Sequence, residues 1–438
     1  MKKLFLLLAI SLILPLGTVS AQDLPFVRKV VKTLTAPDMY GRGYAYNGDR
    51  IAAEYLRGVM KDLHLQPLVP DYFQTYYFNV AGMEGEISLS INGQKLELFK
   101  DYRVHNFSQS FDGTAPIICF DANDLCDSAK LAAFCKKNAK KLPSAFVYLD
   151  MTTLKEMSKE ESQKFGRAAY YLSYKNPFHS RGIICGVGQF SIWSFNGCQF
   201  ERNFTLLHVD PKAMPANPKT LQMHVYNHFH KHQTQNVCGY IKGDVEPDTM
   251  IVFTGHYDHM GQMGDNIIYY GANDNASGAA MVLDFARHYS LQKNYYTMVF
   301  LDFSGEEAGL LGSRHFTHNP PIDLSKVKFV INLDLLCSGE EGITVENTKT
   351  GTEKKYFDEM VKINAEKNYL TVLKDRANAP NSDHYSFQQQ NVPAIFIYAM
   401  GKSGGIHDPS DDYDSCTFSG YEGIFRLLLD LVDRLPKM

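Results

Sequence analysis

Hydrophobic and polar positions in the second half of the chain follow a pattern that predicts strands alternating with helices. Continuous apolar runs bounded by turn residues predict buried strands. These runs lie at residues 237–243, 249–255, 296–303, 327–335 and 392–398. Apolar residues at a period of three to four predict helices at residues 277–291, 308–318, 352–367 and 420–435. This alternation predicts an α/β fold with a central mixed, largely parallel sheet flanked by helices.

The first half of the chain divides into two parts with different patterns. Residues 48–63 have an apolar face at helical spacing and predict an amphipathic helix. Residues 72–221 instead carry alternating stretches and many aromatic residues and cysteines, and they contain no catalytic pattern. We therefore expect one domain formed by residues 22–71 and 222–438, interrupted by a β-rich module at residues 72–221.

The N-terminal segment has the pattern of a secretory signal peptide. Lys2 and Lys3 precede an apolar run at residues 4–16, and small residues follow up to Ala21. An uncleaved membrane anchor is the alternative, although the apolar run is short for a membrane span. We expect cleavage after Ala21, a secreted or periplasmic location, and no membrane attachment after signal removal.

Charge and cysteine content narrow the function classes. The 438 residues contain 44 Lys and Arg and 48 Asp and Glu, so the formal net charge is 44 − 48 = −4. This balance disfavours nucleic acid as a partner, because phosphate binding needs a basic excess. Eight cysteines in an exported chain permit disulfides. Five of them lie between residues 119 and 198, so we expect any bridges to concentrate there.

Candidate catalytic chemistry gathers where the predicted strands end. Histidines and carboxylates follow these strands or lie in the loops between them, where ligands bind in open α/β sheets. These residues are His256, Asp258, Asp274, Glu306, Glu307, Asp334 and His407. Imidazole and carboxylate together suit zinc, and a single catalytic zinc uses three protein ligands. Five of these residues are plausible ligands, namely His256, Asp274, Glu307, Asp334 and His407. This number favours two zinc ions that share a carboxylate.

Charge repulsion supports the same interpretation. Asp274, Glu306, Glu307 and Asp334 would bring four negative charges together. Each like-charged pair at about 4 Å would cost on the order of 4 kcal/mol at an effective dielectric constant of about 20. Two divalent cations would remove this repulsion. Adjacent Glu306 and Glu307 point in different directions, so one can bind metal while the other acts as a base on an activated water.

Six ordered motifs resemble those of the di-zinc exopeptidases of metallopeptidase family 28. They read HYDHMG, GANDNASGAA, FSGEEAGLLGS, NLDLLCSG, NSDHYSF and GIHDPSDDYD, and the resemblance covers residues 236–416. The family includes bacterial aminopeptidases and glutamate-carboxypeptidase-like enzymes. The resemblance implies a zinc exopeptidase-like, phosphorylase/hydrolase-like fold. It also implies an insert that is a cap or a protease-associated-like module.

The same resemblance implies a role for each candidate residue. His256 and Asp334 would bind one zinc, Glu307 and His407 would bind the other, and Asp274 would bridge the two. Glu306 is the expected general base, Asp258 is expected to orient His256, and Asp383 and His384 are expected to support the site. Some members use a tyrosine near these motifs to hold the oxyanion, and none stands at those positions here. Tyr385 or Tyr398 could take that role.

Other histidines are interpreted as structural or surface residues rather than metal ligands. His228, His230 and His232 recur at period two and predict the wet face of a hairpin. His259 lies near the first motif, and we interpret it as a packing or surface residue.

These inferences predict an exported zinc metallopeptidase, most simply an aminopeptidase that hydrolyses peptide bonds near the N-terminus of peptide substrates. A carboxypeptidase or dipeptidase of the same family remains an alternative, because no group that recognises a chain end is identifiable. Glutaminyl cyclase, which uses one zinc on a similar scaffold, is a second alternative. A catalytically inactive binding domain is a third, and retention of all five candidate ligands and the base disfavours it.

Overall fold

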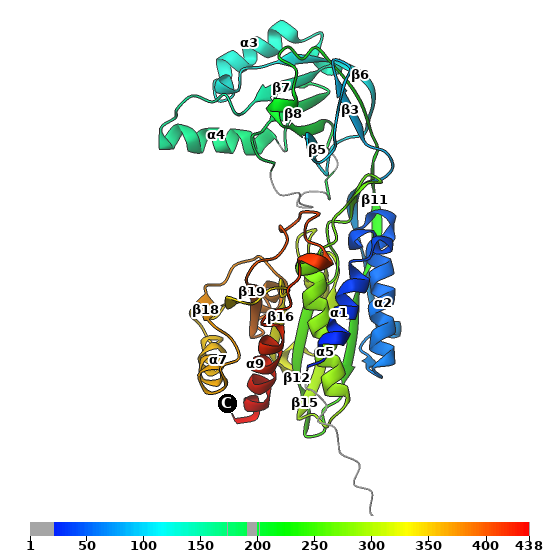
Figure 1. Cartoon of the computed structure of the whole chain (residues 1–438), viewed down its shortest axis with the longest axis vertical. Helices are drawn as coiled ribbons and strands as arrows, with labels where there is room; N and C mark the ends of the chain where they lie inside the picture. The colour runs from blue at the N-terminus through cyan, green and yellow to red at the C-terminus, as the bar shows by residue number, and fades with distance from the viewer. Residues whose placement is uncertain (1–21, 173, 191–198, 201, 438) are drawn as a thin grey trace, which may run out of the picture.

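The computed structural model describes residues 22–172, 174–190, 199–200 and 202–437 in two lobes (Figure 1). The predicted signal peptide at residues 1–21 lies outside this part of the chain. The first lobe, residues 22–83 and 227–437, is built around one sheet, and the second lobe, within residues 84–226, is built around another. No helix of the described residues is long and apolar enough to cross a membrane.

Nine of the described strands form the sheet of the first lobe, in the order β1-β11-β15-β12-β16-β19-β17-β18 with β2 beside β11. Their bounds are β1 Gln66–Pro67, β2 Phe73–Met83, β11 Asn227–Ile241, β12 Glu246–His256, β15 Tyr296–Phe303, β16 Val327–Leu333, β17 Gly342–Glu346, β18 Leu373–Arg376 and β19 Ala394–Met400. The central pairs β15–β12, β12–β16 and β16–β19 are parallel, whereas β11 pairs antiparallel with β15 and β2. The predicted α/β class is confirmed.

Helices cover both faces of this sheet. Their bounds are α1 Leu24–Leu34, α2 Gly48–Asp62, α5 Ser277–Ser290, α6 Leu311–His318, α7 Lys354–Lys367, α8 His384–Gln388 and α9 Tyr421–Arg434. Ile251 and Phe253 of β12 share a core with α1, α2, α5, α7 and α9, while Val252 packs with residues of α6 and α8 on the opposite face. Burial on both faces explains why the central strands read as unbroken apolar runs. The helix predicted from residue 308 begins later, because Gly309 and Leu310 have φ values of 104° and 59°.

The second lobe is also mixed rather than purely β-structured. Its strands are β3 Ser88–Ile91, β4 Gln94–Leu96, β5 Tyr102–Val104, β6 Phe111–Cys119, β7 Phe146–Asp150, β8 Gly182–Gly186, β9 Thr205–Val209 and β10 Thr220–Val225. The sheet order is β4-β3-β10-β6-β7-β8-β9-β5, and β6 to β9 run parallel. Helices α3 Ser128–Asn138 and α4 Lys159–Leu172 accompany it.

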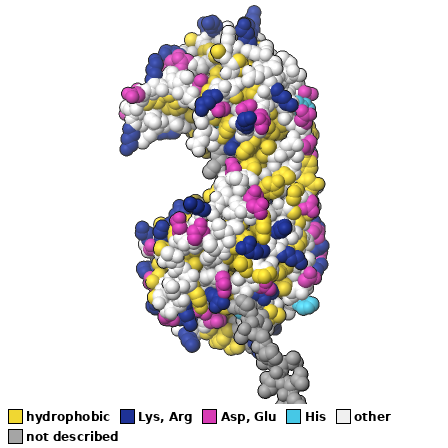
Figure 2. Space-filling model, in the orientation of Figure 1, with side chains coloured by type: hydrophobic (Ala, Val, Ile, Leu, Met, Phe, Trp, Pro, Cys, Tyr) yellow, Lys and Arg dark blue, Asp and Glu magenta, His cyan; other side chains and the backbone are white. Residues whose placement is uncertain are grey.

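A long antiparallel ribbon joins the two lobes. β2 lies within the predicted insert, yet it pairs along its whole length with β11, from Phe73 opposite Val237 to Met83 opposite Asn227. The space-filling view shows a deep hollow on one side, between the two lobes (Figure 2). Because β11 starts beside the second lobe and runs antiparallel to β15, the carboxyl ends of β15 and β12 point toward that lobe.

The cysteines pair differently from the expectation. Among the described residues, Cys337 and Cys416 form a disulfide, whereas Cys119, Cys126, Cys135, Cys185 and Cys238 are free. The expected concentration of bridges between residues 119 and 198 is therefore wrong for the described cysteines. These thiols lie on separate elements, and the Cys135 thiol instead lies against the carbonyl of Pro177 at 3.7 Å.

Candidate metal centre

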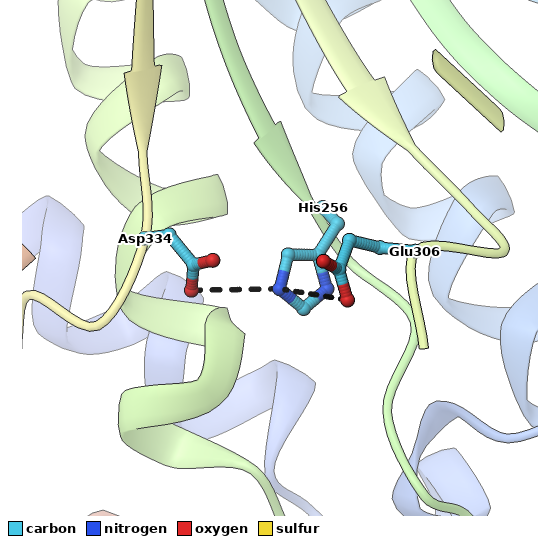
Figure 3. Close-up of side chains that lie close together, drawn as sticks. All are labelled: His256, Glu306 and Asp334. Atoms are coloured by element: carbon cyan, nitrogen blue, oxygen red, sulfur yellow. Dashed lines mark ion pairs between the residues drawn. The ribbon is translucent and has the colours of Figure 1, made fainter. Parts of the chain in front are cut away.

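Three neighbouring strands deliver candidate ligands to one edge of the sheet. β12 ends at His256, opposite Phe303 of β15, and Thr254 of β12 lies opposite Asn332 of β16. The chain continues from β15 to Glu306 and Glu307 and from β16 to Asp334. Figure 3 shows His256 between Asp334 and Glu306, with the three side chains pointing toward one another. Parallel register therefore brings together residues that lie far apart in the sequence.

The five predicted metal ligands form one connected cluster through Asp274. Nε2 of His256 lies 3.4 Å from Oδ1 of Asp274 and 3.5 Å from Oδ1 of Asp334. Nε2 of His407 lies 3.2 Å from Oδ2 of Asp274 and 3.0 Å from Oε2 of Glu307. The two oxygens of Asp274 thus face the two histidines separately, which is the arrangement expected of a bridging carboxylate.

This cluster fits zinc. With bonds of about 2.0–2.2 Å, the ligand atoms of a tetrahedral zinc lie about 3.3–3.6 Å apart, close to the observed separations. Oδ1 of Asp334 is buried and has no hydrogen-bond partner among the described residues, as expected of an atom that faces a cation. Two overlapping sets, His256–Glu306–Asp334 and His256–Asp274–Glu307, each offer ligand atoms within 4.8 Å of one another. The geometry therefore leaves room for two adjacent ions.

Adjacent Glu306 and Glu307 have opposite electrostatic environments. Burial raises the pKa of Glu306 well above its ordinary value, and the carboxylates of Glu307, Asp383 and Asp334 add to this effect. Burial acts in the same direction on Glu307, but His407 and His259 together outweigh it and lower the pKa of Glu307. Nε2 of His256 is 4.0 Å from Oε2 of Glu306, farther than from Asp274 or Asp334. Two carboxyl groups with pKa values pushed apart are suited to different roles.

Asp258 connects the first strand end to the loop that carries the two glutamates. Its carboxylate accepts hydrogen bonds from the backbone N–H groups of Glu306 and Glu307, both at 3.3 Å, and from the Tyr44 hydroxyl at 2.6 Å. Nδ1 of His256 faces the backbone carbonyl of Asp258 at 3.1 Å and its carboxylate at 3.7 Å. Such contacts fix the ring orientation of a metal-binding histidine.

Two further groups hold the ligands in place. The Ser382 hydroxyl donates to Oδ2 of Asp334 at 3.0 Å, and the predicted supporting residues Asp383 and His384 are buried beside it at the start of α8. Asp411, which sequence reasoning did not single out, accepts hydrogen bonds from the backbone N–H groups of residues 273 and 274 at 2.8 and 3.0 Å.

Two histidines differ from the expectation. His259 is fully buried, and its Nδ1 lies 2.9 Å from Oε1 of Glu307, so it contacts a candidate ligand rather than forming part of the surface. The signal was its position three residues after His256, within the motif HYDHMG. His232 is also buried, 2.9 Å from the Asp49 carboxylate, so the prediction of a wet face is wrong for this residue. His228, by contrast, is exposed.

A cavity of about 570 Å³ opens onto the cluster. Beyond the candidate ligands and Glu306, the described residues that line it include Arg376, Phe396, Tyr398 and Ile406. Tyr398 therefore reaches the site, whereas Tyr385 is not among the lining residues.

Comparisons with known proteins agree with the motifs. Residues 236–432 match the model for peptidase family M28. A probable zinc metalloprotease of Pyricularia oryzae is 36% identical over 107 residues, covering 24% of this chain and 21% of that protein. Aminopeptidase YwaD of Bacillus subtilis is 28% identical over 207 residues, covering 42% of this chain and 41% of that protein. The chain thus spans less than half the length of these curated relatives.

Solved structures are similar over a larger part of the chain. An aminopeptidase from Aneurinibacillus sp. strain AM-1 has a TM-score of 0.62 at 18% identity, and the match covers 94% of both chains. A zinc aminopeptidase from Bacillus subtilis has a TM-score of 0.65 at 15% identity and also covers 94% of both chains. At these identities the likeness shows the fold alone. Together the comparisons confirm the predicted family resemblance and support the predicted class, a zinc metallopeptidase.

Proposed function

We propose that the protein is an exported di-zinc aminopeptidase, because residues 236–432 match the model for peptidase family M28. The observation that carries this proposal is the cluster of five ligands joined through Asp274, with Glu306 beside it. His256 and Asp334 would hold one zinc, Glu307 and His407 the other, and Asp274 would bind both. When bound, zinc polarises the substrate carbonyl and lowers the pKa of water from 15.7 to about 7.

Glu306 is the proposed general base. Its carboxylate faces the cluster, and its environment favours proton uptake, because burial raises its pKa well above the ordinary value. In this role it takes a proton from the attacking water and then donates that proton to the leaving amine. Asp258 positions this carboxylate by accepting a hydrogen bond from the backbone N–H group of Glu306.

The predicted insert at residues 72–221, most of which forms the second lobe, is proposed to act as a cap or protease-associated-like module. Two contacts bring the second lobe to the site. Nη2 of Arg103 lies 3.9 Å from Oδ2 of Asp408, next to His407, and the Gln199 amide donates to the carbonyl of Ala308, next to Glu307. A lobe fixed at both points would limit access to the ends of peptides. Removal of residues 1–21 would accompany export.

A screen of chromogenic substrates tests the proposal. Aminoacyl 4-nitroanilides and their N-acetylated counterparts should be incubated with the zinc-loaded protein, with a chelator, and after zinc has been added back. We expect hydrolysis of the substrates with a free amino group only, loss of activity with the chelator, and recovery as two zinc ions per chain are restored. Equal cleavage of the acetylated substrates would contradict an aminopeptidase. Cyclisation of N-terminal glutamine by a protein with one zinc would favour glutaminyl cyclase instead.

A further inference from the structure

The cavity that contains the metal cluster also contains a fixed positive charge. Arg376 is the only Lys or Arg among the described residues that line it. Apolar and aromatic residues line the same cavity, among them Leu335, Phe396 and Ile406. A substrate seated with its scissile bond at the metal cluster would therefore share this cavity with a cation.

The register of three edge strands places this cation. β18 runs parallel to β17, with Arg376 opposite Glu346, and both residues end their strands. β19 runs antiparallel to β17, with Phe396 opposite Glu346 and Tyr398 opposite Thr344. These strands lie on one side of the sheet, next to β16, which leads to Asp334 (Figure 1).

Among the described residues, Arg376 is anchored through Nη1. Its Nη1 lies 3.2 Å from Oε2 of the fully buried Glu346 and donates to the Tyr398 hydroxyl at 3.1 Å. The Asn381 amide also donates to Oε2 of Glu346, at 3.2 Å, which fixes the partner carboxylate. The Arg376 side chain is 50% exposed, and its contacts within the described part of the chain run through Nη1, which leaves Nε and Nη2 for a ligand. A guanidinium held in this way presents a planar fork that matches a carboxylate.

We propose that Arg376 binds a carboxylate of the substrate, an inference that rests on the proposed aminopeptidase function. The carboxylate has two possible sources: the acidic side chain of the N-terminal residue, or the free C-terminus of a dipeptide. Because Glu346 already balances the charge of Arg376, recognition depends on the geometry of the fork rather than on charge alone. Lysine at this position would therefore not replace arginine.

Two substrate pairs separate these sources. Glu and Gln 4-nitroanilides differ in the side-chain carboxylate, and Leu-Ala and Leu-Ala amide differ in the terminal carboxylate. The full-length zinc-loaded protein should be compared with Arg376→Gln, Arg376→Lys and Arg426→Gln. Arg426 is an exposed residue of α9 paired with Glu422, so it provides the same loss of charge away from the cavity.

We expect the unmodified protein to prefer the carboxylate member of one pair, and that pair identifies the source. The ratio of kcat/KM values within the pair should fall about tenfold in Arg376→Gln and Arg376→Lys. This fall corresponds to the lower end of the range for a hydrogen bond to a charged group. We expect the lower end because the Arg376 side chain is half exposed and solvent screens its charge. The ratio should stay unchanged in Arg426→Gln. If Arg376→Gln does not fold because Glu346 loses its partner, the double variant Glu346→Gln/Arg376→Gln removes both charges and should show the same fall.

Two results would overturn the inference. One is a folded Arg376 variant with both ratios unchanged, and the other is an unmodified protein that prefers the uncharged member of both pairs. In either case hydrolysis of Leu 4-nitroanilide would leave the aminopeptidase proposal standing. If no anilide or dipeptide is hydrolysed, the aminopeptidase proposal itself fails and the inference fails with it.

Discussion

Replacement of Tyr44 by phenylalanine tests how the buried network supports the metal centre. The Tyr44 side chain is 2% exposed, and its hydroxyl donates to Oδ2 of the fully buried Asp258 at 2.6 Å. Tyr44→Phe removes this donor with little change in shape. Asp258 would then keep the longer contacts, at 3.3 Å from the backbone N–H groups of Glu306 and Glu307 and at 3.7 Å from Nδ1 of His256.

The expected cost follows from the charge and burial of the acceptor. A hydrogen bond to a charged group contributes about 1.5–3 kcal/mol to stability. For a domain of about 150–250 residues, each kcal/mol shifts the melting temperature by about 2–4 °C. Tyr44→Phe should therefore lower the melting temperature of the zinc-loaded protein by roughly 3–12 °C in circular dichroism. Zinc content should be retained, because Asp258, which accepts the Tyr44 hydroxyl, is not one of the five candidate ligands. The kcat should fall, because the loop that carries Glu306 loosens.

A matched control lies in the same lobe. Tyr289 of α5 is 3% exposed, and its hydroxyl has no hydrogen-bond partner in the described part of the chain. Tyr289→Phe removes an equally buried hydroxyl without breaking a hydrogen bond, so its melting temperature should stay the same or rise. If both variants have the same melting temperature, the hydrogen bond from Tyr44 to Asp258 does not stabilise the protein.

Three further predictions concern the cluster and the second lobe. Glu306→Gln should retain zinc, measured by atomic absorption, and lose about 10²–10⁴-fold in kcat, whereas Glu307→Gln should lose zinc as well; equal zinc loss in both would refute the separate roles. Chelation should lower the melting temperature, because zinc stabilises the state that binds it and its removal leaves clustered carboxylates unbalanced; a chelator-insensitive melting temperature would contradict this. Burial lowers the pKa of His105 to about 3 and of His208 to about 4, below the ordinary 6.5, so the unfolded chain takes up protons first as pH falls. The urea concentration at the unfolding midpoint of the second lobe should therefore decrease as the pH is lowered from about 6.5 toward 4. The same decrease in a His105→Gln/His208→Gln variant would refute this cause.

The parts that could be predicted from the sequence are those that depend on local pattern. β12, β15 and β16 are buried on both faces, so their apolar runs were readable, and the residues that follow them were identified as candidate ligands. Their convergence follows from parallel register, a general property of such sheets. The helix at residues 48–63 was also predicted, because one face of α2 packs on the core.

The missed residues act through contacts that are distant in the sequence. Arg42 is fully buried and donates to the carbonyls of Tyr257 and Gly271, 215 and 229 positions away, so no local pattern reveals it. His259 faces Glu307 only because β12 and β15 end side by side. The pairing of Arg376 with Glu346 likewise requires the register of β17 and β18. In each case tertiary contact, rather than periodicity, assigns the role.

The Cys337–Cys416 bridge ties together two stretches of chain that each continue from a candidate ligand, Asp334 on one side and His407 on the other. Such links persist in oxidising compartments and are lost where thiols are kept reduced. A chain retained in a reducing cytosol would hold these two stretches together through hydrogen bonds alone, such as the one from the Phe418 N–H group to the carbonyl of Cys337 at 2.7 Å. Passage to an oxidising space would add a covalent link between the two stretches that carry these candidate ligands.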